Sequence, residues 1–511
     1  MHDMVRDVAL WIASLTGHAI LVRTKMDVRM LVEEENIKDK KVISLWDVNN
    51  GQFPDNQLNC PQLETLLLHS PMVHFEVPNA CLERLEMLKI LAFLTVDYTW
   101  EWYSMRPSFS LPQSIDSLQN IHTLCLRGYE LGDISILESL QALEILDLRG
   151  SSFEELPSEI IKLKKLKLLD LYGCSIEKNN AYKVIGCLQL EELYLHLIEY
   201  EENFPHDVSF TKLQRYVILL EEDSSNWKSS VDKPSRALSV DGFNASAQSF
   251  ISLPIKDLFL RAEYLDLNNL KGGYKNVIPC MDPQGQGMNQ LIVLKLNTCL
   301  EMECLFDNTN VGLLHTQVVF ANLVELVLYD MDSLRGVFHD YFSQCFPNNG
   351  EEIEEGNVSD QNHTNLTLSK LKRFEVTGCN KLEYIFPMYF AKGLVSLNDF
   401  KICGCSELKY VFGSEKKSRL SIYQQESLHQ AHIDLKFLNL NTLWLHALPN
   451  LIDIWPEYCR PCLLNLNDLH CYGCPKLSNL SVRKAMIDST LQQDHATMVY
   501  SSVLPKTLKI N

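Results

Sequence analysis

Leucine residues recur along the chain as the pattern L-x-x-L-x-L, in which Ile, Val, Phe, Tyr or Cys sometimes replace Leu. Clear copies begin at Leu63, Ile121, Leu143, Leu166, Leu190, Leu291, Leu323, Leu371, Leu397, Leu440 and Leu466. Weaker copies begin at Leu88, Leu213 and Ala262, with a remnant near Leu238 and Val240. Some fifteen copies in one chain indicate a structural repeat, so the repeat is considered before any candidate site.

The period of this repeat predicts the fold. Its central residue recurs through Leu124, Leu146, Leu169, Leu193 and Tyr216, as in a leucine-rich repeat of about 20–29 residues. The two leucines of L-x-L point to one side of a short strand, and the residues between them point to the other. One repeat cannot bury its apolar side alone, so stacked repeats must share a continuous core. We therefore predict an α/β solenoid, a curved parallel sheet with short helices and loops on its convex side, together with a short helical segment at the N-terminus.

Two forms of the repeat indicate two halves. Residues 41–220 contain the motif Leu-Pro-x-x-Ile at 111–115 and 156–160. Proline there ends the strand side of the repeat, and a short helical turn can begin. Residues 236–485 instead end repeats with a bulky pair, such as Leu305 and Phe306, which we interpret as convex-side core. Polar segments that break the period are predicted to be solvated insertions, at 221–235, 346–365 and 413–430. Residues 486–511 are predicted to form a C-terminal tail.

Small residues follow the predicted strands. Cysteine occupies this place at Cys174, Cys299, Cys379, Cys405 and Cys474, mostly after glycine. A small side chain fits a tight turn, and a weakly polar one can contact the turn backbone. The chain's 16 cysteines are scattered singly, which is typical of a reducing compartment where they act as small hydrophobic residues.

Composition and charge exclude several classes of protein. The 511 residues include 46 Lys and Arg against 65 Asp and Glu, a formal charge of −19, and 46% of them are hydrophobic. Such a chain can bury a large core, which excludes wholesale disorder. An acidic balance argues against nucleic acid as a partner, because phosphate binding needs a basic surface. No run of about 18 apolar residues occurs, so we expect no transmembrane segment.

Two cysteine pairs raise the possibility of a zinc site. Cys459-x-x-Cys462 is followed by Cys471-x-x-Cys474, and four thiolates can close a tetrahedron around zinc. The eight intervening residues are fewer than usual, and the repeat already explains Cys471 as inward and Cys474 as a turn residue. We therefore expect no metal. No hydrolase or metalloprotease motif appears either, so we predict a non-catalytic protein.

The outward strand positions line the predicted concave face, where binding to another protein is expected. The candidates are Arg127, Arg149, Tyr172, Tyr194, His196, Tyr329, Trp444, His446, His470 and Tyr472. Arginine and aromatic residues dominate interface energies, although any one of them can also be ordinary surface. Trp444, Tyr472 and the two histidines near them are the preferred group, with His446 and His470 expected at equivalent positions of neighbouring repeats.

The first nine residues, MHDMVRDVA, closely resemble the MHD segment of plant intracellular immune receptors. These are the nucleotide-binding, leucine-rich-repeat disease-resistance proteins, particularly the coiled-coil class, in which the repeats follow that segment directly. The resemblance implies that residues 1–40 are the winged-helix end of a nucleotide-binding region. It also implies that His2 faces the phosphate of bound ADP and that Asp3 fixes the local geometry.

The resemblance implies a cytoplasmic sensor and autoinhibitory region for defence against pathogens. Its partner would be a pathogen effector, a guarded host protein or the receptor's own nucleotide-binding domain. The chain has no G-x-x-x-x-G-K-[S/T] loop, so we expect no cofactor, with ADP or ATP bound only where an upstream nucleotide-binding domain is present. Two alternatives stay open. They are a stand-alone repeat adaptor, such as a ubiquitin-ligase substrate receptor, and a secreted recognition protein with a cleaved leader and glycans.

Overall fold

The computed structural model forms two compact units, residues 1–235 and 236–511. The second unit begins where the second form of the repeat was predicted to begin. The structure describes residues 17–22, 37–45, 59–69, 77–95, 106–177, 189–197, 210–220, 234–243, 246, 250, 253, 255–282, 288–307, 319–339, 368–413, 433–454, 459–463, 465–477 and 507–510.

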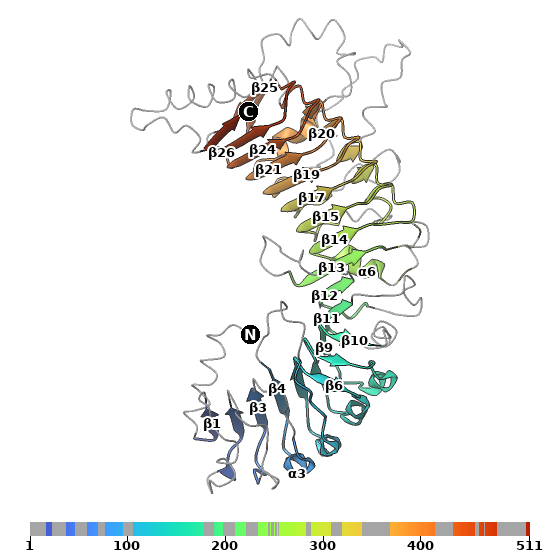
Figure 1. Ribbon diagram of the computed structural model, residues 1–511, viewed down its shortest axis with the longest axis vertical. Helices are drawn as coiled ribbons and strands as arrows, with labels where there is room; N and C mark the ends of the chain where they lie inside the picture. The colour runs from blue at the N-terminus through green and yellow to red at the C-terminus, as the bar shows by residue number, and fades with distance from the viewer. Residues whose placement is uncertain are drawn as a thin grey trace, which may run out of the picture. The chain divides into compact units, whose positions relative to one another are not determined.

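In the first unit, short strands pair in chain order and all in parallel (Figure 1). They are β1 (Ala19–Val22), β2 (Val42–Leu45), β3 (Thr65–His69), β4 (Ile90–Leu94), β5 (Thr123–Arg127), β7 (Ile145–Asp147), β9 (Leu168–Leu171), β11 (Glu192–Leu197) and β12 (Arg215–Leu220). β1 lies within residues 1–40, so the repeat sheet includes part of the segment expected to end a nucleotide-binding region.

Short turns and a second small sheet cover the other side of these strands. The turns are α3 (Asn79–Leu82) and the 3-10 helices η2 (Gln113–Ser117), η3 (Ser135–Ser139) and η4 (Ser158–Lys162). The small sheet contains β6 (Glu130–Gly132), β8 (Ser152–Phe153) and β10 (Ser175–Ile176). Pro112 and Pro157 immediately precede η2 and η4, which confirms the helical turn predicted at Leu-Pro-x-x-Ile.

The second unit repeats the arrangement with longer convex segments. Its main parallel sheet contains β13 (Arg236–Asp241), β14 (Tyr264–Asn268), β15 (Val293–Asn297), β17 (Glu325–Tyr329), β19 (Arg373–Thr377), β21 (Asp399–Cys403), β24 (Thr442–His446), β26 (Asp468–Tyr472) and β27 (Thr507–Ile510). β27 lies in the stretch predicted as a tail, where the leucine spacing had indicated no repeat.

Among the described residues, the convex side of the second unit holds two helical segments and three strand pairs. They are α6 (Lys256–Arg261), η7 (Met388–Gly393), β16 (Phe306–Asp307) with β18 (Phe338–His339), β20 (Tyr384–Pro387) with β22 (Tyr410–Gly413), and β23 (Ile433–Lys436) with β25 (Cys459–Cys462). The phenylalanines of the bulky pairs stack here, with ring centroids 6.0 Å apart between Phe386 and Phe412. Both are buried, so the predicted convex core is confirmed. The architecture as a whole is the predicted α/β leucine-rich-repeat solenoid.

Strand register explains why the leucine spacing is so regular. The inward residues of neighbouring strands are direct partners, as Leu146 is with Leu124 and with Leu169. All three are completely buried, and burying a leucine stabilises the fold by about 1.5–3 kcal/mol. A register slip of one residue would place these leucines on the outward face.

A left-handed backbone turn follows many strands of the main sheets. Gly150 and Gly473 occupy it with φ of +71° and +70°, a conformation that glycine adopts without steric cost. At Gly473 a Cβ atom would also lie only 3.2 Å from the Cα atom of Ala447 in the preceding repeat. The glycine before the turn cysteines therefore allows both the turn and the close approach of adjacent repeats.

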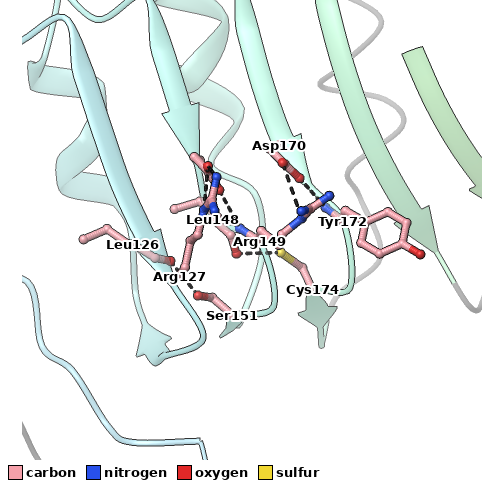
Figure 2. A network of polar contacts seen from close by, with 9 residues as sticks. Leu126, Arg127, Leu148, Arg149, Ser151, Asp170, Tyr172 and Cys174 are labelled. Carbon is pink, nitrogen blue, oxygen red and sulfur yellow. Dashed lines mark hydrogen bonds and ion pairs between the residues drawn. The ribbon is translucent and has the colours of Figure 1, made fainter. Parts of the chain in front are cut away.

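The small residue after this turn caps the preceding repeat, as Figure 2 shows for two successive repeats. The Ser151 hydroxyl donates to the Leu126 carbonyl at 2.7 Å, and the Cys174 thiol donates to the Leu148 carbonyl at 3.0 Å. These contacts confirm that small, weakly polar residues contact turn backbone. They satisfy carbonyl groups that would otherwise be buried without a partner.

Candidate protein-binding face

The concave face is defined here as the outward residues of the main parallel sheet in each unit. In the first unit, Arg127, Arg149 and Tyr172 each follow the second inward leucine of their repeat, and His196 lies at the same position on β11. The four side chains therefore come from four successive repeats.

Two aspartates bind the arginines of this row. Asp147 accepts a hydrogen bond from Arg127 Nε at 2.7 Å and a second, short contact from the same guanidinium. Arg149 Nε lies 3.6 Å from Asp170 (Figure 2), and its guanidinium carbon is 5.0 Å from the centroid of the Tyr172 ring. Asp147 and Asp170 are only 5% and 6% exposed. The arginines are therefore partly committed to holding the sheet together, although their outer atoms are accessible.

Burial dominates the electrostatics of this row. It raises the pKa of Asp170 to about 6, and the nearby Asp147 carboxylate acts in the same direction, against the attraction of Arg149. An aspartate that titrates near pH 6 makes this row sensitive to mild acid.

Tyr194 and His196 lie together on β11 as predicted. The Tyr194 hydroxyl is 3.4 Å from the Glu192 carboxylate, and burial followed by this negative charge raises the pKa of Tyr194. The His196 ring lies 6.0 Å from the Tyr172 ring. The predicted residues of the first unit therefore form a contiguous set.

Tyr329 lies apart from the other candidates of the second unit. Its hydroxyl donates to Glu375 at 2.7 Å, and Arg373 donates to the other oxygen of that carboxylate at 2.8 Å. Although burial opposes it, these hydrogen bonds lower the pKa of Glu375. The Tyr329 hydroxyl is already hydrogen-bonded to Glu375. This side chain therefore helps to hold neighbouring strands together and does not offer a free hydroxyl to a partner.

Trp444, His446, His470 and Tyr472 are brought together on β24 and β26. The Trp444 and His470 rings stack with centroids 4.6 Å apart, and the His446 and Tyr472 rings stack at 5.4 Å. Trp444 is 41% exposed and Tyr472 is 56% exposed. The structure thus unites the preferred group in one patch.

One expectation about this patch is wrong. The two histidines were expected at equivalent positions, but the register pairs Trp444 with His470 and His446 with Tyr472. The histidines are therefore diagonal neighbours in different rows. His446 follows Leu445, whereas His470 precedes Cys471. Because Leu445 and Cys471 are lateral partners, the two histidines are offset by two residues.

Several residues of the concave face were missed. Lys401 Nζ lies 6.0 Å from the centroid of the Trp444 ring, and Cys403 Sγ lies 3.2 Å from His446 Nδ1. In the first unit, Ile90, Ile145 and Leu168 pair laterally with Thr123 or with each other at the first outward position, and all three are partly exposed. The signal was available, because the residue before each inward leucine also points outward, but an aliphatic residue there resembles core.

No metal or membrane site emerges from the described part of the chain. Within it, no three His, Cys, Asp or Glu side chains are placed to hold a metal ion, and no helix is long and apolar enough to cross a membrane. Cys471 is buried at its inward position, and the Cys474 thiol donates weakly to the Leu445 carbonyl at 3.9 Å. His2, Asp3 and the side chains of Cys459 and Cys462 lie outside the described residues.

Comparison with known proteins finds sequences that are similar to these repeats. Residues 348–491 match the family described as plant disease resistance protein RPS2-like, leucine-rich repeats. The chain is 24% identical to disease resistance protein At4g27190 of Arabidopsis thaliana over 92% of its own length and 47% of that protein. It is 29% identical to disease resistance protein RFL1 of Arabidopsis thaliana, over 34% of this chain and 16% of that protein.

Among solved structures, the leucine-rich-repeat ectodomain of the Arabidopsis receptor kinase HAESA is similar, with a TM-score of 0.38 and 15% identity. The match covers 90% of this chain and 81% of that chain.

The chain spans about half the length of At4g27190, and smaller shares of the other disease resistance proteins. The chain is therefore similar to plant disease resistance proteins, and its residues 348–491 match the leucine-rich repeats of one such family.

Proposed function

We propose that this chain is the sensing and autoinhibitory repeat region of a plant intracellular immune receptor, and that it acts in the cytoplasm by binding protein. A disease resistance relative that aligns along 92% of this chain supports this function over that of a ubiquitin-ligase adaptor. Because the chain spans about half of that relative, the complete receptor would contain further domains.

One observation carries the choice of binding surface. Trp444 and Tyr472 are large apolar side chains that remain exposed on the concave face of the second unit, each stacked against a histidine. Clustered aromatic residues supply much of the binding energy in protein interfaces. A protein partner that covers this patch would bury both rings.

Signalling requires that the partner distinguish two states of the receptor. Binding to the repeats changes an off/on equilibrium only when the partner has different affinities for the two states. In the complete receptor, the nucleotide-binding domain would be the part that changes between the off state and the on state. ADP or ATP would bind to that domain, with His2 and Asp3 as its MHD residues, and the repeat region would need no cofactor of its own.

Site-specific photo-crosslinking in plant tissue tests the surface. A photoreactive amino acid replaces Tyr472 in one preparation of the full chain and Leu300, which is 49% exposed in the same unit, in another. We expect a discrete protein adduct from position 472, weakened at least tenfold by Trp444→Ala, and none at position 300. Equal adducts at both positions, or none at 472 in pathogen-challenged tissue, would remove this patch from the function.

A further inference from the structure

The repeat that contains β26 carries two cysteines three positions apart. Cys471 lies on the inward side of β26 and is buried, and Cys474 lies in the turn that follows and is partly exposed. Gly473 has a φ of +70°, and the turn that it allows brings the Cys474 thiol within 3.9 Å of the Leu445 carbonyl oxygen. Tyr472, an exposed residue of the aromatic patch, lies between the two cysteines in sequence.

The two thiol groups contact each other. The Cys474 thiol donates a hydrogen bond to Cys471, and this bond lowers the pKa of Cys471, although burial opposes the change. The thiolate is the nucleophilic form of cysteine. A disulfide bond is about 2.05 Å long, so thiols that are already in hydrogen-bond contact need only a small shift to join.

The residue type at position 471 departs from the repeat. In other repeats with a turn cysteine, the inward position three residues earlier holds an aliphatic side chain that is completely buried. The four examples are Leu171 before Cys174, Leu296 before Cys299, Val376 before Cys379 and Ile402 before Cys405. A thiol buries less apolar surface than these side chains do. The departure therefore costs core stability and places a second thiol against the turn cysteine.

Access to solvent distinguishes this pair from another pair in the same unit. Cys474 is partly exposed, so a small disulfide in solution can reach its sulfur atom. The thiols of Cys379 and Cys405, in neighbouring repeats, are also hydrogen-bonded to each other. Both of these residues are completely buried. The second pair thus has the same contact without the access.

We propose that Cys471 and Cys474 are a redox-active dithiol that forms an intramolecular disulfide by exchange with a low-molecular-weight disulfide such as oxidised glutathione. In a reducing compartment such a pair stays reduced, and its disulfide forms only when the supply of oxidised thiol rises. The closed ring contains Tyr472, so the modification lies within the aromatic patch. The proposal does not depend on the proposed function, because it concerns the chemistry of this chain alone.

The exchange takes place in two balanced steps. As the Cys474 sulfur attacks one sulfur of the small disulfide, its proton moves to the Cys471 thiolate and a small thiolate leaves. The Cys471 sulfur then attacks the Cys474 sulfur of the mixed disulfide, and its proton leaves with the second small thiol. The two cysteines lose two electrons, which the small disulfide gains as it divides into a thiolate and a thiol.

Alkylation after equilibration with glutathione tests the proposal. The full chain is incubated with equal amounts of oxidised and reduced glutathione, quenched with acid, unfolded in guanidinium and alkylated with N-ethylmaleimide. Endoproteinase Asp-N, which cleaves before Asp468 and Asp488, gives a peptide of residues 468–487 with no other cysteine. We expect this peptide to lack both maleimide groups and to be lighter by two hydrogen atoms than its dithiol form. Dithiothreitol added before the quench should restore both groups.

Two single variants separate the roles of the cysteines. Cys471→Ser has no second thiol to resolve the mixed disulfide, so glutathione should accumulate on Cys474. Cys474→Ser has lost the accessible thiol, so Cys471 should stay unmodified. The buried pair is the control within the same chain, and Cys379 and Cys405 should both be recovered with maleimide groups.

Three results would overturn the proposal. The first is a peptide 468–487 that stays fully reduced after equilibration. The second is a glutathione adduct on Cys474 of the unaltered chain that Cys471 does not displace. The third is oxidation of Cys379 and Cys405 to the same extent, because access would then not select the site.

Discussion

Individual residues on the concave face differ in how far they are buried. Asp147 and Asp170 are nearly buried beneath the arginines of adjacent repeats. Trp444 and Tyr472 instead lie open to solvent above the same kind of strand. The difference follows from neighbours, because a carboxylate under a guanidinium is shielded, whereas stacked rings leave their edges exposed.

Asp170 should make the first unit more stable in mild acid. Its pKa is about 6 in the folded chain against an ordinary value of 3.8. A raised folded-state pKa contributes stability that is fully present below pH 3.8 and lost as the pH rises through 6. The contribution is on the order of 3 kcal/mol at most.

Urea unfolding of the full chain and of Asp170→Asn measures this effect. The free energy of unfolding of the unaltered chain should rise relative to the variant as the pH falls from 7 to 4.5, since asparagine does not titrate. A difference that stays constant over this range would contradict a raised pKa for Asp170.

At the scale of the element, several repeats have one small capping residue after the strand. Serine and cysteine both occupy the position, because either can donate to the buried carbonyl of the preceding repeat. The sequence indicated this role through the size and weak polarity of these residues. It did not indicate that Ser151 performs it in the repeat before Cys174.

Replacing Ser151 should distinguish the hydrogen bond from packing. Ser151→Ala leaves the Leu126 carbonyl without its donor and removes the acceptor for the Tyr129 backbone amide. We expect a loss of about 1–3 kcal/mol in the free energy of unfolding. Ser151→Cys retains a weak donor and should lose less than half as much. Equal losses in the two variants, measured by urea unfolding, would show that packing alone matters.

At the scale of the whole molecule, stability is a sum over neighbouring repeats. Each strand of the main sheets pairs with the strands before and after it, within its unit. Repeat proteins of this kind transmit a local defect chiefly to adjacent repeats. A defect in one repeat should therefore destabilise that repeat and its neighbours more than distant repeats.

Leu146→Ala tests this expectation. Leu146 is completely buried on β7, and truncating such a leucine costs about 2–5 kcal/mol. Hydrogen exchange followed by mass spectrometry should show faster exchange in β5, β7 and β9. Exchange in β21, β24 and β26 should be unchanged. Acceleration of equal size in both sets of strands would indicate global cooperativity instead.

Much of the solenoid was predictable because its driving force is periodic. Leu124, Leu146 and Leu169 recur at the repeat length, and hydrophobic burial requires only that they face the same side. β27 could not be predicted in the same way, because its pairing with β26 depends on an edge that the preceding repeats create. Ile90 was hidden for a related reason, since an aliphatic residue in a strand resembles core until the register is known.

The sequence by itself determined the repeat, the inward leucines, the turn residues and the aromatic character of the second concave face, because each depends on local spacing and residue type. Only the tertiary structure decided which outward residues are partners. It paired Trp444 with His470 and committed Tyr329 to Glu375. Lateral contacts join residues more than 20 positions apart, so they follow from the register between repeats, which the sequence of one repeat does not specify.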